Sequence, residues 1–200
     1  VLMNHTTSFN IAITTSGKNG LDLGSESGSH WYAVFLISGS VAGLGGLMSL
    51  SQTTPTMPSG FTHKRRLGWV RNDGSSNLLN FKMYGNDRER RVDWNEARNT
   101  TLRVLNGGNA TSYTNIDCSS LKPPTAQETW FSAMATAGDN WIGIRSEDCP
   151  DAANGQVNVN PDIAALQVSS IGMTGSNLQY ASTAADEYLN LAVLGYKDFL

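Results

Sequence analysis

Acidic side chains gather beside one of the two cysteines of the chain. Glu147, Asp148 and Asp151 flank Cys149. Two carboxylates across a cleft can hydrolyse a glycosidic bond, and carboxylate oxygens are also the ligands that calcium prefers. The spacing follows no calcium-loop pattern, and short charged runs of this kind are typical of solvated loops. The sequence therefore favours a loop, with glycan hydrolysis or calcium binding as the alternatives.

The motifs that usually mark a catalytic or cofactor site are incomplete. Residues 24–28 read GSESG and have Glu26 where a nucleophile elbow needs its serine. Residues 43–48 read GLGGLM and lack the last glycine and the following helix of a dinucleotide fingerprint. No histidine has a paired metal-binding spacing; the three are His5, His30 and His63. We expect no cofactor, no metal and no enzymatic activity.

Cys118 and Cys149 stand 31 positions apart. This spacing fits no zinc pattern, and neither residue belongs to a C-x-x-C pair. A single disulfide would suit an oxidising medium, whereas two free thiols would suit synthesis in a reducing cytoplasm. The sequence favours free thiols and leaves the pairing open.

Tryptophans are the strongest candidates for ligand contact. A flat aromatic ring stacks well on the apolar face of a sugar. The alternative for each ring is packing in the core. The candidates are Trp69, Trp94, Trp130 and Trp141.

Two basic runs, at residues 64–66 and 88–91, offer a second kind of contact. Their guanidinium groups could bind anionic sugars or phosphates of a bacterial surface. More often such residues face solvent or pair with carboxylates across a subunit boundary. The candidates are Arg65, Arg66, Arg90 and Arg91.

The composition excludes several classes of partner. Charged residues make up 16% of the chain and its net charge is −3, whereas about 25% charged residues is typical of a soluble domain. A nucleic-acid binder would usually be basic, so we expect no nucleic-acid partner. The longest apolar run, residues 31–37, is far shorter than the roughly 18 residues of a membrane helix, so we expect no membrane insertion.

Apolar residues recur with a period of two, which is typical of strands. Residues 31–37 are apolar on both faces and predict a central strand covered on both sides by sheet or by a partner chain. Residues 125–137 alternate and also predict a strand. Further strands are predicted around residues 9–13, 67–71, 78–83, 102–104, 142–144, 163–169 and 189–193. We expect one elaborated all-β domain over residues 1–200, an antiparallel, jelly-roll-like β-sandwich with little or no helix.

Three segments resemble a β-sandwich module of tailed-phage fibre and appendage proteins. The first is GLDLG at 20–24 followed by WYAVFLI at 31–37, and the second is TPTMPSGFT at 54–62 followed by KRRLG at 64–68. The third is the closing LNLAVLGYKD at 189–198. The three segments follow one another in the same order as in those modules. Residues 1–92 are the most similar to them, residues 93–187 are the variable part, and residues 188–200 form the closing strand. The GLGG stretch at 43–46 and the two cysteines depart from the pattern.

The resemblance implies a structural protein on the exterior of a virion, in a fibre or another appendage, and a homotrimer. It also implies other virion proteins as partners, and recognition of a host-surface glycan if the module is distal. Three alternatives remain: a purely architectural head-decoration or neck protein, a glycan depolymerase, and a carbohydrate-binding module unrelated to viruses.

Overall fold

The chain folds almost entirely into strands. A computed structural model describes residues 8–86, 88–136, 141–149, 156–159, 167–186 and 188–200, and these contain no helix. The all-β prediction is therefore confirmed. The strands are β1 (Gly20–Leu21), β2 (Trp31–Gly39), β3 (Gly43–Ser49), β4 (His63–Arg71), β5 (Phe81–Gly85), β6 (Glu89–Trp94), β7 (Arg103–Gly108), β8 (Thr114–Asp117), β9 (Ala126–Thr136), β10 (Ile142–Ser146), β11 (Val157–Val159), β12 (Gln167–Gly172), β13 (Asn177–Ser182) and β14 (Tyr188–Phe199).

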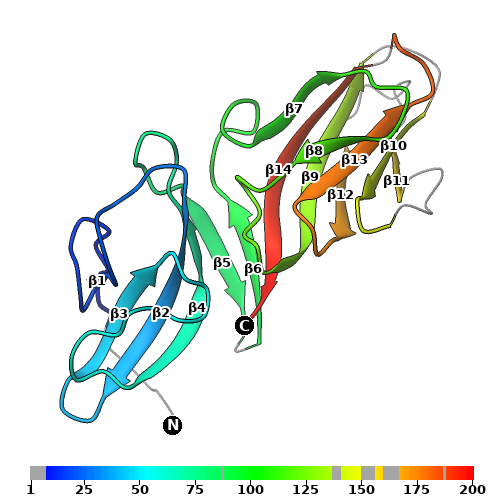
Figure 1. The fold of residues 1–200 in the computed structure, drawn as a ribbon. Helices are drawn as coiled ribbons and strands as arrows, with labels where there is room; N and C mark the ends of the chain where they lie inside the picture. The colour runs from blue at the N-terminus through cyan, green and yellow to red at the C-terminus, as the bar shows by residue number, and fades with distance from the viewer. Residues whose placement is uncertain (1–7, 87, 137–140, 150–155, 160–166, 187) are drawn as a thin grey trace. The chain divides into compact units, whose positions relative to one another are not determined.

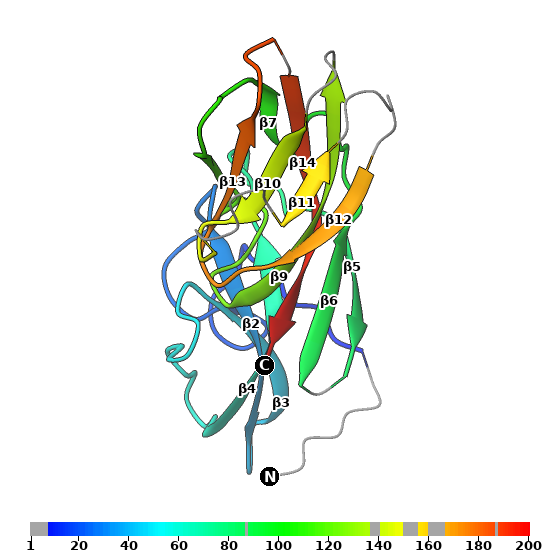
Figure 2. The same cartoon turned by 90° about the vertical axis from the view of Figure 1, so that its right-hand side faces the viewer.

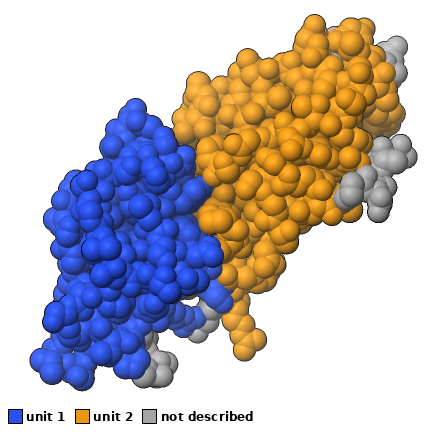
Figure 3. Space-filling view, in the orientation of Figure 1, with its two compact units in different colours: residues 1–79, 200 blue, residues 80–199 orange. Residues whose placement is uncertain are grey.

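The strands belong to two compact units, shown in Figure 3. Unit 1 comprises residues 1–79 with Leu200, and unit 2 comprises residues 80–199. The boundary between the units lies between residues 79 and 80, before the end of the part at residues 1–92 that is most similar to the phage modules. The reason is strand pairing: β5 pairs with β6, and β6 pairs with β14 of the closing segment. No membrane-spanning helix is found in the part of the chain that the structure describes.

Unit 1 holds one four-stranded sheet in the order β1-β3-β2-β4 (Figure 1). β2 lies between β3 and β4 and is antiparallel to both, whereas the short β1 runs parallel to β3. The prediction of a central strand at 31–37 is confirmed. The basic residues 64–66 lie on β4, at the edge of this sheet.

Loops of the same chain cover both faces of β2. On one face Phe35 and Ile37 pack with Phe61, and Met57 lies against the same cluster. On the other face Tyr32 packs with residues of the segment before β2, including Ile13 and Leu21. The second apolar face therefore has its cover within unit 1 and gives no argument for an oligomer.

Residues 9–13 were predicted to be a strand, and that prediction is wrong. They form no ladder, although Ile13 is buried and Ile11 packs beside it. A Cβ at Gly46 of β3 would collide with the side chains of Ile11 and Phe9. Gly46 thus makes room for this segment to cross the sheet.

Asp22, within the GLDLG motif, links the segments that carry the family resemblance. Its Oδ2 accepts hydrogen bonds from the Ser49 hydroxyl at 2.7 Å and from the Thr56 amide at 2.9 Å. Its Oδ1 accepts one from the Leu23 amide. One carboxylate therefore joins the end of β3 to the proline-containing loop.

Unit 2 contains two sheets that form the layers of a sandwich (Figures 1 and 2). The larger has the order β12-β9-β14-β6-β5, and β7 also pairs with β14. The smaller has the order β11-β10-β13-β8. The strand prediction for residues 189–193 is confirmed, because they lie within β14, where Leu189, Leu191 and Val193 are buried and Ala192 of the opposite face is buried as well.

Candidate functional site

Three of the four candidate tryptophans pack in the core. Trp69 is 3% exposed and lies in the core cluster of unit 1. Trp94 donates a hydrogen bond from Nε1 to the Leu121 carbonyl at 3.0 Å and is buried. Trp130 is buried opposite Gly195 of β14. For these three rings the structure shows core packing, which was the alternative weighed for each of them from the sequence.

The four candidate arginines are divided between the two units. Arg65 and Arg66 belong to unit 1, and the Arg66 guanidinium lies 5.4 Å from the centroid of the Trp69 ring. Arg90 and Arg91 belong to β6 of unit 2. Arg91 lies 4.2 Å from the centroid of the Trp130 ring, and its Nε donates to Asp93 at 3.1 Å.

Glu147 and Asp148 of the acidic cluster accept hydrogen bonds from the turn between β12 and β13. Asp148 Oδ2 accepts hydrogen bonds from the amides of Thr174 at 2.6 Å and Gly175 at 3.0 Å. Glu147 accepts both the amide and the side-chain amino group of Asn177. Because the Gly175 and Thr174 amides stabilise its ionised form, the pKa of Asp148 is held below its usual value.

A metal site in this cluster has no support in the described residues, which hold no group of three metal-ligating side chains. Asp151 and His5 lie outside the described part of the chain. His30 Nδ1 donates to the Gly28 carbonyl at 2.6 Å, and His63 contacts the Thr62 hydroxyl.

Both cysteines are free. Cys118 is buried, and its burial raises the pKa of the thiol to about 12, so the group stays protonated at neutral pH. Cys149 is exposed.

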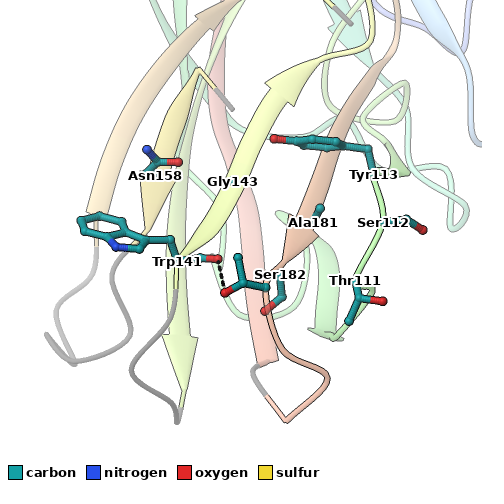
Figure 4. A pocket seen from close by; sticks show the side chains of 9 residues that line it. Thr111, Ser112, Tyr113, Trp141, Gly143, Asn158, Ala181 and Ser182 are labelled. Carbon is teal, nitrogen blue, oxygen red and sulfur yellow. Dashed lines mark hydrogen bonds between the residues drawn. The ribbon is translucent and has the colours of Figure 1, made fainter. Parts of the chain in front are cut away.

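The fourth tryptophan, Trp141, borders a hollow of about 550 Å³ on the outer face of the smaller sheet (Figure 4). We call it the Trp141 hollow. The ring of Trp141 is 53% exposed. The residues that line the hollow are Thr111, Ser112, Tyr113, Trp141, Gly143, Asn158, Ala181, Ser182 and Thr183.

The floor of the Trp141 hollow consists of small residues. Gly143 of β10 pairs with Asn158 of β11 on one side and with Ala181 of β13 on the other. Their neighbours along β10, Ile142 and Ile144, are fully buried. Side chains alternate across a sheet, so Gly143 and Ala181 face outward and leave space above the sheet.

Aromatic rings stand on opposite sides of this floor. Figure 4 shows Trp141 on one side and Tyr113, which precedes β8, on the other. The Trp141 backbone carbonyl accepts hydrogen bonds from the Thr183 amide and hydroxyl, at 3.4 and 3.5 Å. The loop that follows β13 therefore anchors the base of the tryptophan.

A chain of polar contacts fixes Tyr113. The Arg145 guanidinium lies 3.6 Å from the centroid of the Tyr113 ring and donates from Nε to Gln179 at 2.9 Å. Gln179 in turn donates to Asn115 at 2.8 Å. Burial raises the pKa of Tyr113, partly offset by the positive charge of Arg145, so the phenol remains a neutral hydrogen-bonding group.

The side chains that line the Trp141 hollow in the described structure supply hydroxyls, amides and aromatic rings. Sequence reasoning found Trp141 but missed Tyr113, Asn158 and the Gly143–Ala181 floor. These residues meet only through strand register across three pairings, which no local motif signals.

Comparisons with protein-family models, with curated proteins and with solved structures found no match to this chain.

Proposed function

We propose that this chain is a non-catalytic recognition module that binds a neutral sugar in the Trp141 hollow. The observation that carries the proposal is the pair of aromatic rings, Trp141 and Tyr113, standing on opposite sides of a floor of small residues. The volume of the Trp141 hollow, about 550 Å³, falls within the roughly 300–1,000 Å³ that is usual for small-molecule sites.

The chemistry of the lining matches that of a sugar ring. The C–H face of a hexose packs on an aromatic ring, and Trp141 presents one that is more than half exposed. The hydroxyls of the sugar need donors and acceptors, which Asn158, Thr111 and Ser112 supply at the rim. The Gly143 and Ala181 floor lets the ring approach the sheet.

The setting that we propose for this module is a fibre or another exterior appendage of a tailed-phage virion. The support is the resemblance of the segments at 20–37, 54–68 and 189–198 to such modules. The Asp22 contacts support it further, because they join two of these segments into one structural element. In a trimer, weak sugar sites repeated around an axis would gain avidity without any new contact.

The binding proposal is tested with the variant Trp141→Ala. We expect the unaltered protein to bind at least one neutral oligosaccharide on an array of bacterial surface glycans, and the variant to bind it at least about tenfold more weakly, the equivalent of roughly 1.4 kcal/mol. Isothermal titration with that oligosaccharide gives the affinities. The matched control is Tyr84→Ala, which removes an exposed ring of β5 outside the hollow.

Two results would overturn the proposal. One is binding that survives Trp141→Ala unchanged. The other is the absence of any neutral ligand on the array, which would favour a purely architectural protein. Release of new reducing ends from a bound polysaccharide would favour the depolymerase alternative instead. Sedimentation analysis tests the trimer separately, since sugar binding by one chain does not depend on it.

A further inference from the structure

A second hollow of unit 2, of about 240 Å³, lies over β9, β14 and β7 of the larger sheet. We call it the Arg103 hollow. Its lining residues are Arg98, Asn99, Arg103, Asn106, Ser132, Met134, Asn190, Leu191 and Ala192. None of them carries a negative charge.

Strand register builds the floor of the Arg103 hollow. Ala192 of β14 pairs with Ser132 of β9 on one side and with Arg103 of β7 on the other. Ser132 and Ala192 are small and buried, so the arginine stands beside a depression in the sheet. The loop before β7 is held by backbone hydrogen bonds among residues 97–103 and by the Val193 amide, which donates to the Leu102 carbonyl at 2.9 Å. This loop brings Arg98 to the same hollow.

Two asparagine side chains at the Arg103 hollow already accept a hydrogen bond through their amide oxygens. Arg103 Nη1 donates to Asn106 Oδ1 at 2.8 Å, and the Gly107 amide donates to Asn190 Oδ1 at 3.0 Å. Arginine and a backbone amide can only donate, so these contacts fix which side-chain atom of each asparagine is the oxygen. The groups of Asn106 and Asn190 left for a ligand are therefore their amino groups, which are donors.

Arg98 and Arg103 differ in ion pairing from other basic residues of the larger sheet in the part of the chain that the structure describes. Elsewhere on the same sheet Arg91 pairs with Asp93 at 3.1 Å, and Lys197 pairs with Glu89 at 3.0 Å. Among the residues that the structure describes, neither Arg98 nor Arg103 has such an ion pair. The Arg103 hollow thus combines two uncompensated positive charges with amide donors.

We propose that the Arg103 hollow binds an anionic sugar through its carboxylate or phosphate group. Arginine matches the planar oxygens of such groups, and charge-assisted hydrogen bonds are roughly twice as strong as neutral ones. Met134, which is 38% exposed, offers an apolar contact for the carbons of the ring. This site differs in residues and in ligand charge from the Trp141 hollow, and it does not depend on the sugar site proposed there.

The test is titration of the whole chain with four probes, followed by nuclear magnetic resonance. Glucuronate carries a carboxylate, glucose 6-phosphate carries a phosphate, glucose carries neither, and inorganic phosphate lacks the ring. We expect the two anionic sugars to shift the amide signals of residues 98–107 and 190–192, and glucose to leave them unchanged. Comparison of glucuronate with glucose 6-phosphate shows whether the site prefers a carboxylate or a phosphate. Comparison of glucose 6-phosphate with inorganic phosphate shows how much the sugar ring contributes to binding.

The double variant Arg98→Gln/Arg103→Gln should weaken binding of the preferred anionic sugar at least about tenfold, and added salt should weaken binding to the unaltered protein. The control Arg88→Gln removes an exposed arginine outside the hollow and should leave binding unchanged. The proposal is overturned if neither anionic sugar shifts these signals, or if the control loses as much affinity as the double variant. Equal shifts with glucose would also overturn it, because charge would then play no part.

Discussion

At the scale of single residues, the acidic pair at 147–148 stabilises the turn between β12 and β13. Asp148 accepts backbone hydrogen bonds from Thr174 and Gly175, and Glu147 accepts two from Asn177. The carboxylates thereby replace the strand partners that the amides of this turn lack. The two carboxylates therefore stabilise the loop by accepting hydrogen bonds from its backbone amides.

Replacement of Asp148 by Asn should lower the free energy of unfolding by about 1 kcal/mol at neutral pH, since the group is exposed and its charge-assisted bonds are screened. The pKa of Asp148 is depressed in the folded state. Its contribution is therefore complete above the ordinary carboxyl pKa of about 4 and disappears as the pH falls through the folded value. Urea unfolding between pH 2.5 and 7 should show the two proteins converging in acid. A constant difference across this range would contradict the assignment.

Residue type alone could not separate the four candidate tryptophans. Trp94 and Trp130 lie on strands with buried neighbours, and their burial depends on partners distant in sequence, Leu121 and Gly195. Trp141 is exposed because it precedes β10 and points away from the buried face to which Ile142 and Ile144 belong. The alternation at 141–145 indicated two faces but not which one the sheet would bury.

At the scale of elements, β14 shows how one glycine accommodates a large ring. Gly195 pairs with Trp130 of β9 at an irregularity in the register. A Cβ on Gly195 would collide with the Val92 carbonyl and lie 2.6 Å from the Trp130 indole. The missing side chain gives the indole its place against β14.

Gly195→Ala should therefore destabilise unit 2 by about 1–3 kcal/mol, because the added methyl group must displace either the ring or the backbone. Gly172→Ala is the matched control, since a Cβ there would meet only the Gln127 carbonyl oxygen, at 3.8 Å. Thermal unfolding followed by tryptophan fluorescence measures both variants. Equal midpoints for the two would refute the role given to Gly195.

Period-two alternation predicted the paired strands well and failed where no partner strand was within reach. Residues 31–37 and 125–137 correspond to β2 and β9. The segment at 9–13 alternates equally well, yet it crosses β3 over Gly46 without forming a ladder. The predicted strands around 67–71 and 78–83 are joined only by an isolated bridge from Asn72 to Leu78, since β5 pairs with β6 instead. The tertiary fold decides which strands pair with each other, and the local alternation of apolar residues carries no information about that choice.

At the scale of the whole molecule, both hollows belong to unit 2. The Trp141 hollow uses residues between 111 and 183, and the Arg103 hollow uses residues between 98 and 192. The most family-like segments of the N-terminal part, at 20–37 and 54–68, belong to unit 1. Both proposed binding sites therefore lie in unit 2, and the third resembling segment, at 189–198, also belongs to unit 2 and supplies Asn190, Leu191 and Ala192 to the Arg103 hollow.

A fragment of residues 80–199 should fold alone and keep the sugar affinities of the whole chain within about twofold, because it contains every lining residue of both hollows and two complete sheets. Far-ultraviolet circular dichroism reports its strand content, and the titrations described above report its binding. A fragment that folds but loses both ligands would show that the hollows need unit 1.

The contrast between the two thiols has a practical consequence. Cys118 is sequestered and held protonated, whereas Cys149 is accessible to solvent. A maleimide dye or biotin should therefore couple at a single position of the folded protein, on the turn after β10. Such a tag would tether every molecule to a sensor in the same orientation without mutagenesis.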